Sequence, residues 1–380
     1  MIYVQSKCIL GGEKRNSMKI LLKNGRIYDP RSGENRKADI AICNGIIHSI
    51  GKAIYDADEI LDCCDKWIVP SVTDMHVHCF HKRTNLGLYA DEIGICKNVR
   101  NLVDAGSCGA DDIDDFMDDL SEMKTRVKIF INYSSIGLTK NSCELSENCW
   151  LDEDKLMKAI KKYPDVICGV KLRASKSVVK DKGIEPIRSG IQFAHRLHLP
   201  LMIHVGNEPP KLDEVLSLVE KGDILTHIYH GKKGGLFLEN GELNKLAIKK
   251  YQKGVLFDVG HGSASFSFDV AEKAFKLGLI PHLISSDLHA NNYPDKISSL
   301  AEIVTKIYNL GLNERQILDA ISIRPAKILH LDNMIQVGNK ADLSIVSFNK
   351  TDKKRYVDAE GNERIFDKQV VFERLVGSEK

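Results

Sequence analysis

The chain has 380 residues, 43% of them hydrophobic, which is enough to bury the core of one large domain with a smaller unit attached. Its 54 basic and 52 acidic residues nearly balance, and no basic run is long enough to follow a phosphate backbone, which argues against nucleic acid as a partner. The absence of an apolar stretch of about 18 residues and of a secretory signal pattern argues against a membrane partner and favours a cytoplasmic protein.

The two ends of the chain carry β-rich patterns. Residues 1–17 precede a second methionine, Met18, and we expect them to be a leader, either a disordered arm or an upstream start. The runs KILLKNGRIYDP and ADIAICNGIIHSIG then each contain Asn-Gly, which is typical of hairpins. Near the other end, IQVGNKADLSIVSF and KQVVFERLV predict two more strands. We expect residues 18–67 and 334–380 to pair into one small β-sandwich.

Between these ends, residues 68–333 alternate apolar runs with amphipathic helical windows such as LDEDKLMKAIKKY, PIRSGIQFAHRLH and AEKAFKLG. This alternation is typical of β/α units around a parallel sheet. The sequence predicts eight strands, at 68–78, 101–106, 127–134, 167–173, 200–205, 223–228, 255–260 and 282–287. Eight strands predict an α/β fold of the (β/α)8 TIM-barrel type, whose catalytic groups lie at the carboxyl ends of the strands.

His76 and His78 lie at the end of the first predicted barrel strand. Side chains of a strand alternate between its faces, so both imidazoles point the same way and can meet one metal ion. Alone, this pattern is weak, because two such histidines also arise by chance or as a surface pair. Its position at a barrel strand's carboxyl end favours the metal site.

Four further polar residues fall at strand ends. His204 ends the fifth predicted strand, His227 the sixth and Asp287 the eighth, while Lys171 ends the fourth. A lysine at a barrel mouth is ordinarily a salt-bridge partner or a substrate clamp. We favour His227 over His230 because His227 directly ends its apolar run.

With these residues, the chain resembles the amidohydrolase superfamily, in its dihydroorotase-like and amidohydrolase/deacetylase branch. The likeness runs from about Lys19 to Phe348 and includes IVPSVTDMHVH and RPAKILHLDNMIQVGNKADLSIV. It implies a binuclear metal centre, with zinc as the expected metal. By the same resemblance, Lys171 is N6-carboxylated by carbon dioxide and bridges the ions with a hydroxide. The resemblance also implies that the first metal is bound by His76, His78 and Asp287. The second metal is bound by His204 and His227.

This resemblance predicts a reaction mechanism. A carbamate replaces the charge of a lysine, which repels cations, with oxygens that bind them. Two metal ions lower the pKa of a bridging water, so that hydroxide exists near neutral pH and attacks a carbonyl. Asp287 would accept the proton and then donate it to the departing atom, as a general base that becomes a general acid.

Four other residues are candidates for substrate contact. Arg173 lies two residues after Lys171 and suits a substrate carboxylate, although an ion pair within the barrel wall explains it equally well. His289 could donate to a substrate oxygen or hold Asp287 in place. Ser107 in DAGSCGA and His261 in VGHGSASFSF lie in Gly-rich loops that let backbone NH groups approach a ligand.

The leading hypothesis is hydrolysis of an amide or ester bond, of the deacetylase type, in a small carboxylate-bearing acyl compound. A cyclic amidase resembling dihydroorotase or hydantoinase is the alternative. A deaminase of the same superfamily fits less well, because deaminase sites generally resemble a one-metal design without the carboxylated lysine, whereas this chain has Lys171. A non-catalytic scaffold fits poorly, because all six ligand positions are filled. The partner is a small-molecule substrate, and a homo-oligomer is left open.

Overall fold

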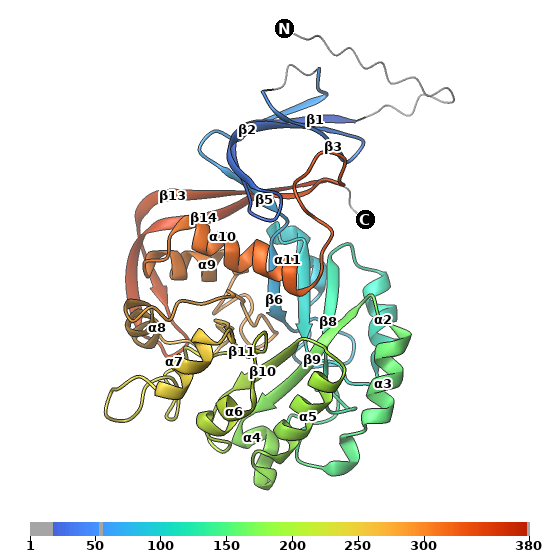
Figure 1. Cartoon of the computed structure of the whole chain (residues 1–380), viewed down its shortest axis with the longest axis vertical. Coiled ribbons are helices and arrows are strands. Elements are labelled where there is room, and N and C mark those ends of the chain that lie inside the picture. The colour runs from blue at the N-terminus through green and yellow to red at the C-terminus, as the bar shows by residue number, and fades with distance from the viewer. Residues whose placement is uncertain (1–17, 53–55, 378–380) are drawn as a thin grey trace.

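The computed structural model describes residues 18–52 and 56–377, so the predicted leader, 1–17, lies outside the described residues. Figure 1 shows a β-rich layer, to which both ends of the chain contribute, beside a curled sheet with helices on its outer side. The fold is therefore mixed α/β, and strands from opposite ends of the chain share a sheet.

The end sheet has seven strands, in the order β14-β13-β5-β1-β2-β3, with β4 paired to β1. Residues 343–346 of β13 pair antiparallel with Trp67–Pro70, which joins the last part of the chain to the first. The strands are β1 (Lys19–Asp29), β2 (Glu34–Cys43), β3 (Ile46–Gly51), β4 (Glu59–Asp62), β5 (Trp67–Pro70), β13 (Asp342–Val357) and β14 (Glu363–Gly377).

The two Asn-Gly pairs differ in role. Asn44 and Gly45 both have positive φ, 52° and 74°, and turn β2 into β3, which confirms the predicted hairpin. The hairpin prediction at Asn24-Gly25 is wrong, because β1 runs through this pair with a register shift. A Cβ at Gly25 would lie 2.3 Å from Ile68 Cδ1, so this glycine makes room for the neighbouring strand.

The second sheet is parallel, in the order β12-β11-β10-β9-β8-β7-β6. The predicted strand 68–78 is divided, since β5 belongs to the end sheet. The predicted strand 282–287 is not assigned as a strand, but single parallel bridges join Leu283 to Asp258 and Leu288 to Val77. The strands are β6 (Thr73–Val77), β7 (Asn101–Ala105), β8 (Arg126–Asn132), β9 (Ile167–Ala174), β10 (Leu201–Val205), β11 (Ile224–Thr226) and β12 (Leu256–Phe257).

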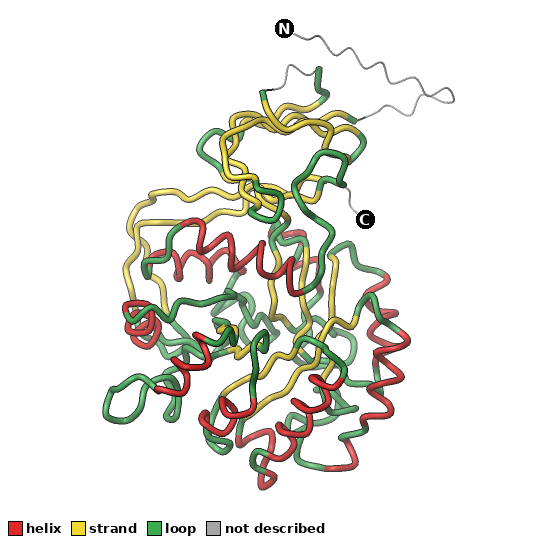
Figure 2. Tube along the Cα trace, in the orientation of Figure 1, coloured by secondary structure: helices red, strands yellow, loops and turns green. Residues whose placement is uncertain are grey.

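Figure 2 shows helices along the outer side of the parallel sheet and beside the long β13–β14 hairpin. The three helical windows quoted above are confirmed as α3, α5 and α8. No helix in the described part of the chain is both long and apolar enough to cross a membrane. The helices are α1 (Ala90–Ile93), α2 (Ile113–Ser121), α3 (Glu153–Lys162), α4 (Lys176–Val179), α5 (Glu185–Arg196), α6 (Leu212–Leu218), α7 (Lys245–Gln252), α8 (Phe268–Lys276), α9 (Leu300–Asn309), α10 (Glu314–Leu318) and α11 (Arg324–Ile328).

Alternate side chains of the parallel strands form a separate apolar cluster that includes Met75, Phe130 and Met202. Phe130 is fully buried and pairs with Gly169 on the next strand. A Cβ at Gly169 would lie 2.2 Å from the Phe130 ring and 2.6 Å from the Pro200 carbonyl oxygen. The glycine therefore leaves the space that the phenyl ring fills.

We expect Gly169→Ala to lower the free energy of unfolding by about 1–3 kcal/mol, the usual cost of overpacking a core. Urea denaturation monitored by circular dichroism measures this change. Combining it with Phe130→Leu should recover part of the loss, because the second change removes one of the two clashes. Equal stability of Gly169→Ala and the wild type would contradict this account.

Candidate metal centre

The six predicted metal ligands line one small cavity of about 170 Å³ at the carboxyl ends of the parallel strands. His76 lies within β6 and His78 one residue beyond it, while Lys171 and His204 lie within β9 and β10. His227 follows β11 directly. The structure thus brings together all six side chains, which come from positions 76 to 287 of the sequence: His76, His78, Lys171, His204, His227 and Asp287.

Asp287 lies between three of the histidines. Its Oδ1 is 3.4 Å from His76 Nε2 and 3.3 Å from His78 Nε2, and its Oδ2 is 3.9 Å from His227 Nε2. Donor atoms of His76, His78 and Asp287 all lie within 4.8 Å of one another, so these residues could hold one cation. Burial acts to raise the pKa of Asp287, but the neighbouring histidines hold that pKa well below its usual range.

The Nδ1 atom of each of these histidines is engaged elsewhere. His76 Nδ1 is 2.9 Å from Thr226 Oγ1, His78 Nδ1 is 2.8 Å from Ser107 Oγ, and His227 Nδ1 is 2.5 Å from the Gly260 carbonyl oxygen. Such contacts fix the orientation of the ring and leave Nε2 free for a metal ion. Three Nε2 atoms therefore face the same carboxylate.

Lys171 is buried beside this group, with Nζ 3.1 Å from His76 Nε2 and 3.4 Å from Met202 Sδ. Burial lowers its pKa to about 7, against the opposing effect of Asp287. A substantial fraction of the amine is therefore uncharged near neutral pH, and the uncharged form is the one that can react with carbon dioxide. His204 completes the cavity, with its ring centroid 4.3 Å from that of His227.

Two of the site residues have strained backbones. His227 and Asp287 have φ of 67° and 53°, a left-handed conformation that side chains other than glycine rarely adopt. The backbone of Asp287 is held on both sides of its Cα. Its NH donates to the His76 carbonyl at 2.7 Å, and its carbonyl accepts from Asn292 Nδ2 at 2.7 Å. These bonds fix where the carboxylate points.

Glycines of two predicted loops lie against the same side chains. A Cβ at Gly106 would come within 2.7 Å of Lys171 Cγ, and one at Gly262 within 2.4 Å of Asp287 Oδ2. At Gly260 it would approach Thr226 Oγ1 to 2.2 Å. The contacts show that these glycines make room for site side chains. The approach of their NH groups to a ligand stays a prediction.

Two of the four predicted substrate contacts line the cavity. His289 lies beside His78, with 6.2 Å between ring centroids. Arg173 also lines it, but its Nη1 donates to Glu144 Oε2 at 3.0 Å, and Glu144 is fully buried. The Arg173 charge is thus compensated within the wall, which corresponds to the ion-pair interpretation of this residue.

Ser107 and His261 are not among the residues that line this cavity. Ser107 contacts His78 as described. His261 has Nε2 3.2 Å from Lys306 Nζ and lines a larger neighbouring cavity. His230, which the sequence analysis did not favour, is also outside, and its Nδ1 accepts from the Lys232 NH at 3.1 Å.

Sequence reasoning missed several contributors. Thr226 immediately precedes His227, and that adjacency was the available signal. Ser286 precedes Asp287 in the same way, and its NH donates to Asp74 Oδ1 at 3.0 Å. The sequence gives no signal that Glu144 or Lys306 lies near the site. Glu144 contacts Arg173 and Lys306 contacts His261, and both partners are distant in sequence.

Comparison with protein-family models gives no match. A deacetylase of Enterococcus faecalis is 36% identical over 358 residues, which cover 92% of this chain and 95% of that protein. Among solved structures, one of an adenine deaminase is 33% identical with a TM-score of 0.86, covering 93% of this chain and 96% of that one. One of a dihydroorotase is 30% identical with a TM-score of 0.87, covering 95% and 98%.

These similarities extend over nearly the whole length of both partners, so they include the end sheet as well as the parallel sheet. They agree with the motif-based resemblance, which depended on residues at strand ends and on the two flanking segments. The chain belongs to the amidohydrolase superfamily, in its dihydroorotase-like and deacetylase branch.

Proposed function

We propose that the protein is a metal-dependent hydrolase that removes an acyl group, of the deacetylase type, from a small carboxylate-bearing compound. The observation that carries this proposal is the convergence of all six ligand side chains on one cavity of about 170 Å³. A relative of 36% identity is named a deacetylase, which supports the class of reaction. The cavity is small enough to favour a short acyl group at the reacting centre.

The residues present fit two divalent ions, for which zinc is the proposed metal. Imidazole nitrogens and carboxylate oxygens are zinc ligands, and the three donor atoms of His76, His78 and Asp287 already lie within 4.8 Å of one another. We propose that Lys171 is N6-carboxylated, that its carbamate would be a ligand shared by both ions, and that His204 and His227 would be the further ligands of the second ion. When bound, such a pair of ions makes hydroxide available near neutral pH and polarises a carbonyl group.

The protein's own groups have separate roles in this proposal. Asp287 would take the proton of the attacking water and deliver it to the departing nitrogen or oxygen, and its lowered pKa keeps the carboxylate ionised. His289, which lines the cavity beside His78, is placed to donate to a substrate oxygen. Thr226 and Ser107 orient the histidine rings so that neither turns away during the reaction.

We further propose that the parallel sheet closes into a (β/α)8 TIM barrel over residues 68–333. The bridges from Leu283 to Asp258 and from Leu288 to Val77 support this, because they link segment 283–288 to both edges of the sheet. Residues 18–67 and 334–380 would then form the second domain, as the shared end sheet suggests.

A cyclic amidase is the second candidate. The likeness to the solved structure of a dihydroorotase, at 30% identity and a TM-score of 0.87, favours it. Both reactions can use the same centre, since each begins with attack on an amide carbonyl. They differ in whether the departing nitrogen remains attached through a ring.

Assays of the zinc-loaded protein separate these functions. We expect turnover of N-acetyl amino acids or O-acetyl hydroxy acids, and loss of that turnover after chelation with recovery on adding zinc. Ring opening of dihydroorotate, followed by ultraviolet absorbance, tests the alternative in parallel. Hydrolysis of dihydroorotate with no turnover of any acyl compound would replace the leading proposal with the second.

Lys171→Ala tests the bridge independently of the substrate. We expect bound metal, measured by elemental analysis, to fall below two ions per chain, and activity to fall at least about 100-fold, because a shared ligand is removed. Formate or propionate should restore part of both, since a small carboxylate can occupy the vacated space. Two retained ions and unchanged activity would show that Lys171 is not a ligand.

A further inference from the structure

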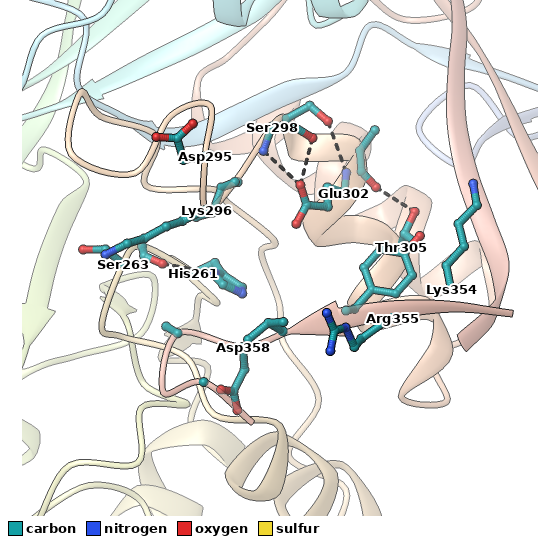
Figure 3. A pocket seen from close by; sticks show the side chains of 18 of the residues that line it. His261, Ser263, Asp295, Lys296, Ser298, Glu302, Thr305, Lys354, Arg355 and Asp358 are labelled. Atoms are coloured by element: carbon teal, nitrogen blue, oxygen red, sulfur yellow. Dashed lines mark hydrogen bonds between the residues drawn. The ribbon is translucent and has the colours of Figure 1, made fainter. Parts of the chain in front are cut away.

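We call the cavity of about 170 Å³ that the six candidate ligands line the metal cavity. A second, larger cavity of about 730 Å³ adjoins it. It lies between the loop that follows β12, the segment 295–299, helix α9 and the β13–β14 hairpin (Figure 3). Ser263 lines both cavities. Gly262 lines the larger one and packs directly on Asp287, which lines the smaller. One short loop therefore separates the two spaces, and Ser263 belongs to both.

The far wall of the larger cavity is firmly held. Val370 NH of β14 donates to Thr305 Oγ1 of α9 at 3.0 Å, and Asp358 Oδ2 accepts from the Phe268 NH at 2.9 Å. Ala359 NH donates to the Phe266 carbonyl at 3.1 Å. These bonds fix the hairpin against the loops around the metal cavity, so the space is a built feature of the fold. Its size is in the range of small-molecule sites.

Most charged groups of this cavity are engaged within the protein. Lys306 contacts Glu302 at 3.0 Å, and Arg355 contacts Glu363 at 3.1 Å. Lys354 Nζ donates to Gln369 Oε1 at 3.4 Å. Glu302 and Asp358 accept hydrogen bonds from Ser298 and Phe268, respectively. Glu302 and Arg355 therefore have oppositely charged partners, whereas the contacts of Lys354 and Asp358 named here are with uncharged groups.

Lys296 lines the larger cavity with an exposed side chain. Figure 3 shows its side chain extending toward Ser263, whereas the Asp295 carboxylate lies on the other side of their loop. Among the described residues, no carboxylate lies within ion-pair distance of its Nζ. An ammonium at this junction suits an anionic group of a substrate.

We propose that the two cavities form one substrate site, in which Lys296 binds the substrate's carboxylate and the larger cavity holds the bulky group next to it. The acyl group lies in the small cavity. This assignment rests on the proposed function and gives Lys296 the anion contact expected of Arg173, whose charge Glu144 already compensates. The substrate class is thus an N-acyl amino acid, or the corresponding O-acyl hydroxy acid, with a large side chain.

Paired ligands test the carboxylate contact. The zinc-loaded full chain is given N-acetylphenylalanine and N-acetylphenylalaninamide, each as both enantiomers, and kcat/KM or, without turnover, Kd by calorimetry is measured. We expect the wild type to prefer the carboxylate by about 10-fold or more, because a charge-assisted bond is lost in the amide. Lys296→Ala should abolish this preference and Lys296→Arg should keep most of it.

Lys276→Ala is the matched control, because Lys276 is exposed on α8 and lines neither cavity. Its preference should equal that of the wild type. A wild type without preference, or a preference that survives in Lys296→Ala, overturns the proposal. A preference that depends on Lys296 but comes with no turnover of any acyl compound overturns the hydrolase proposal alone.

The larger cavity is tested by filling it. Ala301 of α9 lines this cavity. Ala301→Phe should weaken the binding of N-acetylphenylalanine about 10-fold or more and change the binding of N-acetylglycine less than about threefold, since only the bulky group needs the space. Bound zinc and the thermal unfolding midpoint, compared with the wild type, report on folding. Equal weakening of both ligands in a folded, zinc-loaded variant would show that the cavity does not hold the side chain.

Discussion

The arrangement at the mouth of the parallel sheet depends on one buried carboxylate. Three histidine Nε2 atoms lie 3.3–3.9 Å from the oxygens of Asp287, and Lys171 Nζ lies beside one of those histidines. Removing a carboxylate from water costs several kcal/mol, and neighbouring polar groups offset that cost only when their geometry is fixed. The backbone bonds of Asp287 and the Nδ1 contacts of the histidines supply this fixation.

The same crowding explains the composition of the neighbouring loops. With side chains packed around Asp287 and Lys171, the loops that cover them can carry only glycine at the points of closest approach. Gly106, Gly260 and Gly262 occupy these points, and all three have positive φ. Their Gly-rich sequence is therefore a consequence of the site's density. The NH of one of them, Gly262, donates to the Ser286 carbonyl at 3.0 Å.

The sequence predicts those features that depend on local periodicity. Strand alternation places His76 and His78 on one side, and the ends of apolar runs locate Lys171 and His204, because these signals need only a few neighbouring residues. Features decided by distant partners could not be predicted. Asn24-Gly25 has a hairpin signal, yet Ile68 determines that it is a bulge. The segment 282–287 lacks regular pairing, since only single bridges reach its neighbours.

The metal cavity and the larger cavity come from different parts of the chain, and this separation bears on specificity. Five of the six candidate ligands lie in parallel strands or just beyond them, and Asp287 lies in the bridged segment 283–288. The larger cavity is built from loops, α9 and a hairpin of the end sheet. Relatives of similar fold are named for different reactions: a deacetylase, an adenine deaminase and a dihydroorotase. A change in the hairpin or in the segment 295–299 alters the space and charge beside the reacting centre without moving a strand that carries a ligand. The end sheet can therefore influence which substrate fits, although it supplies none of the candidate ligands.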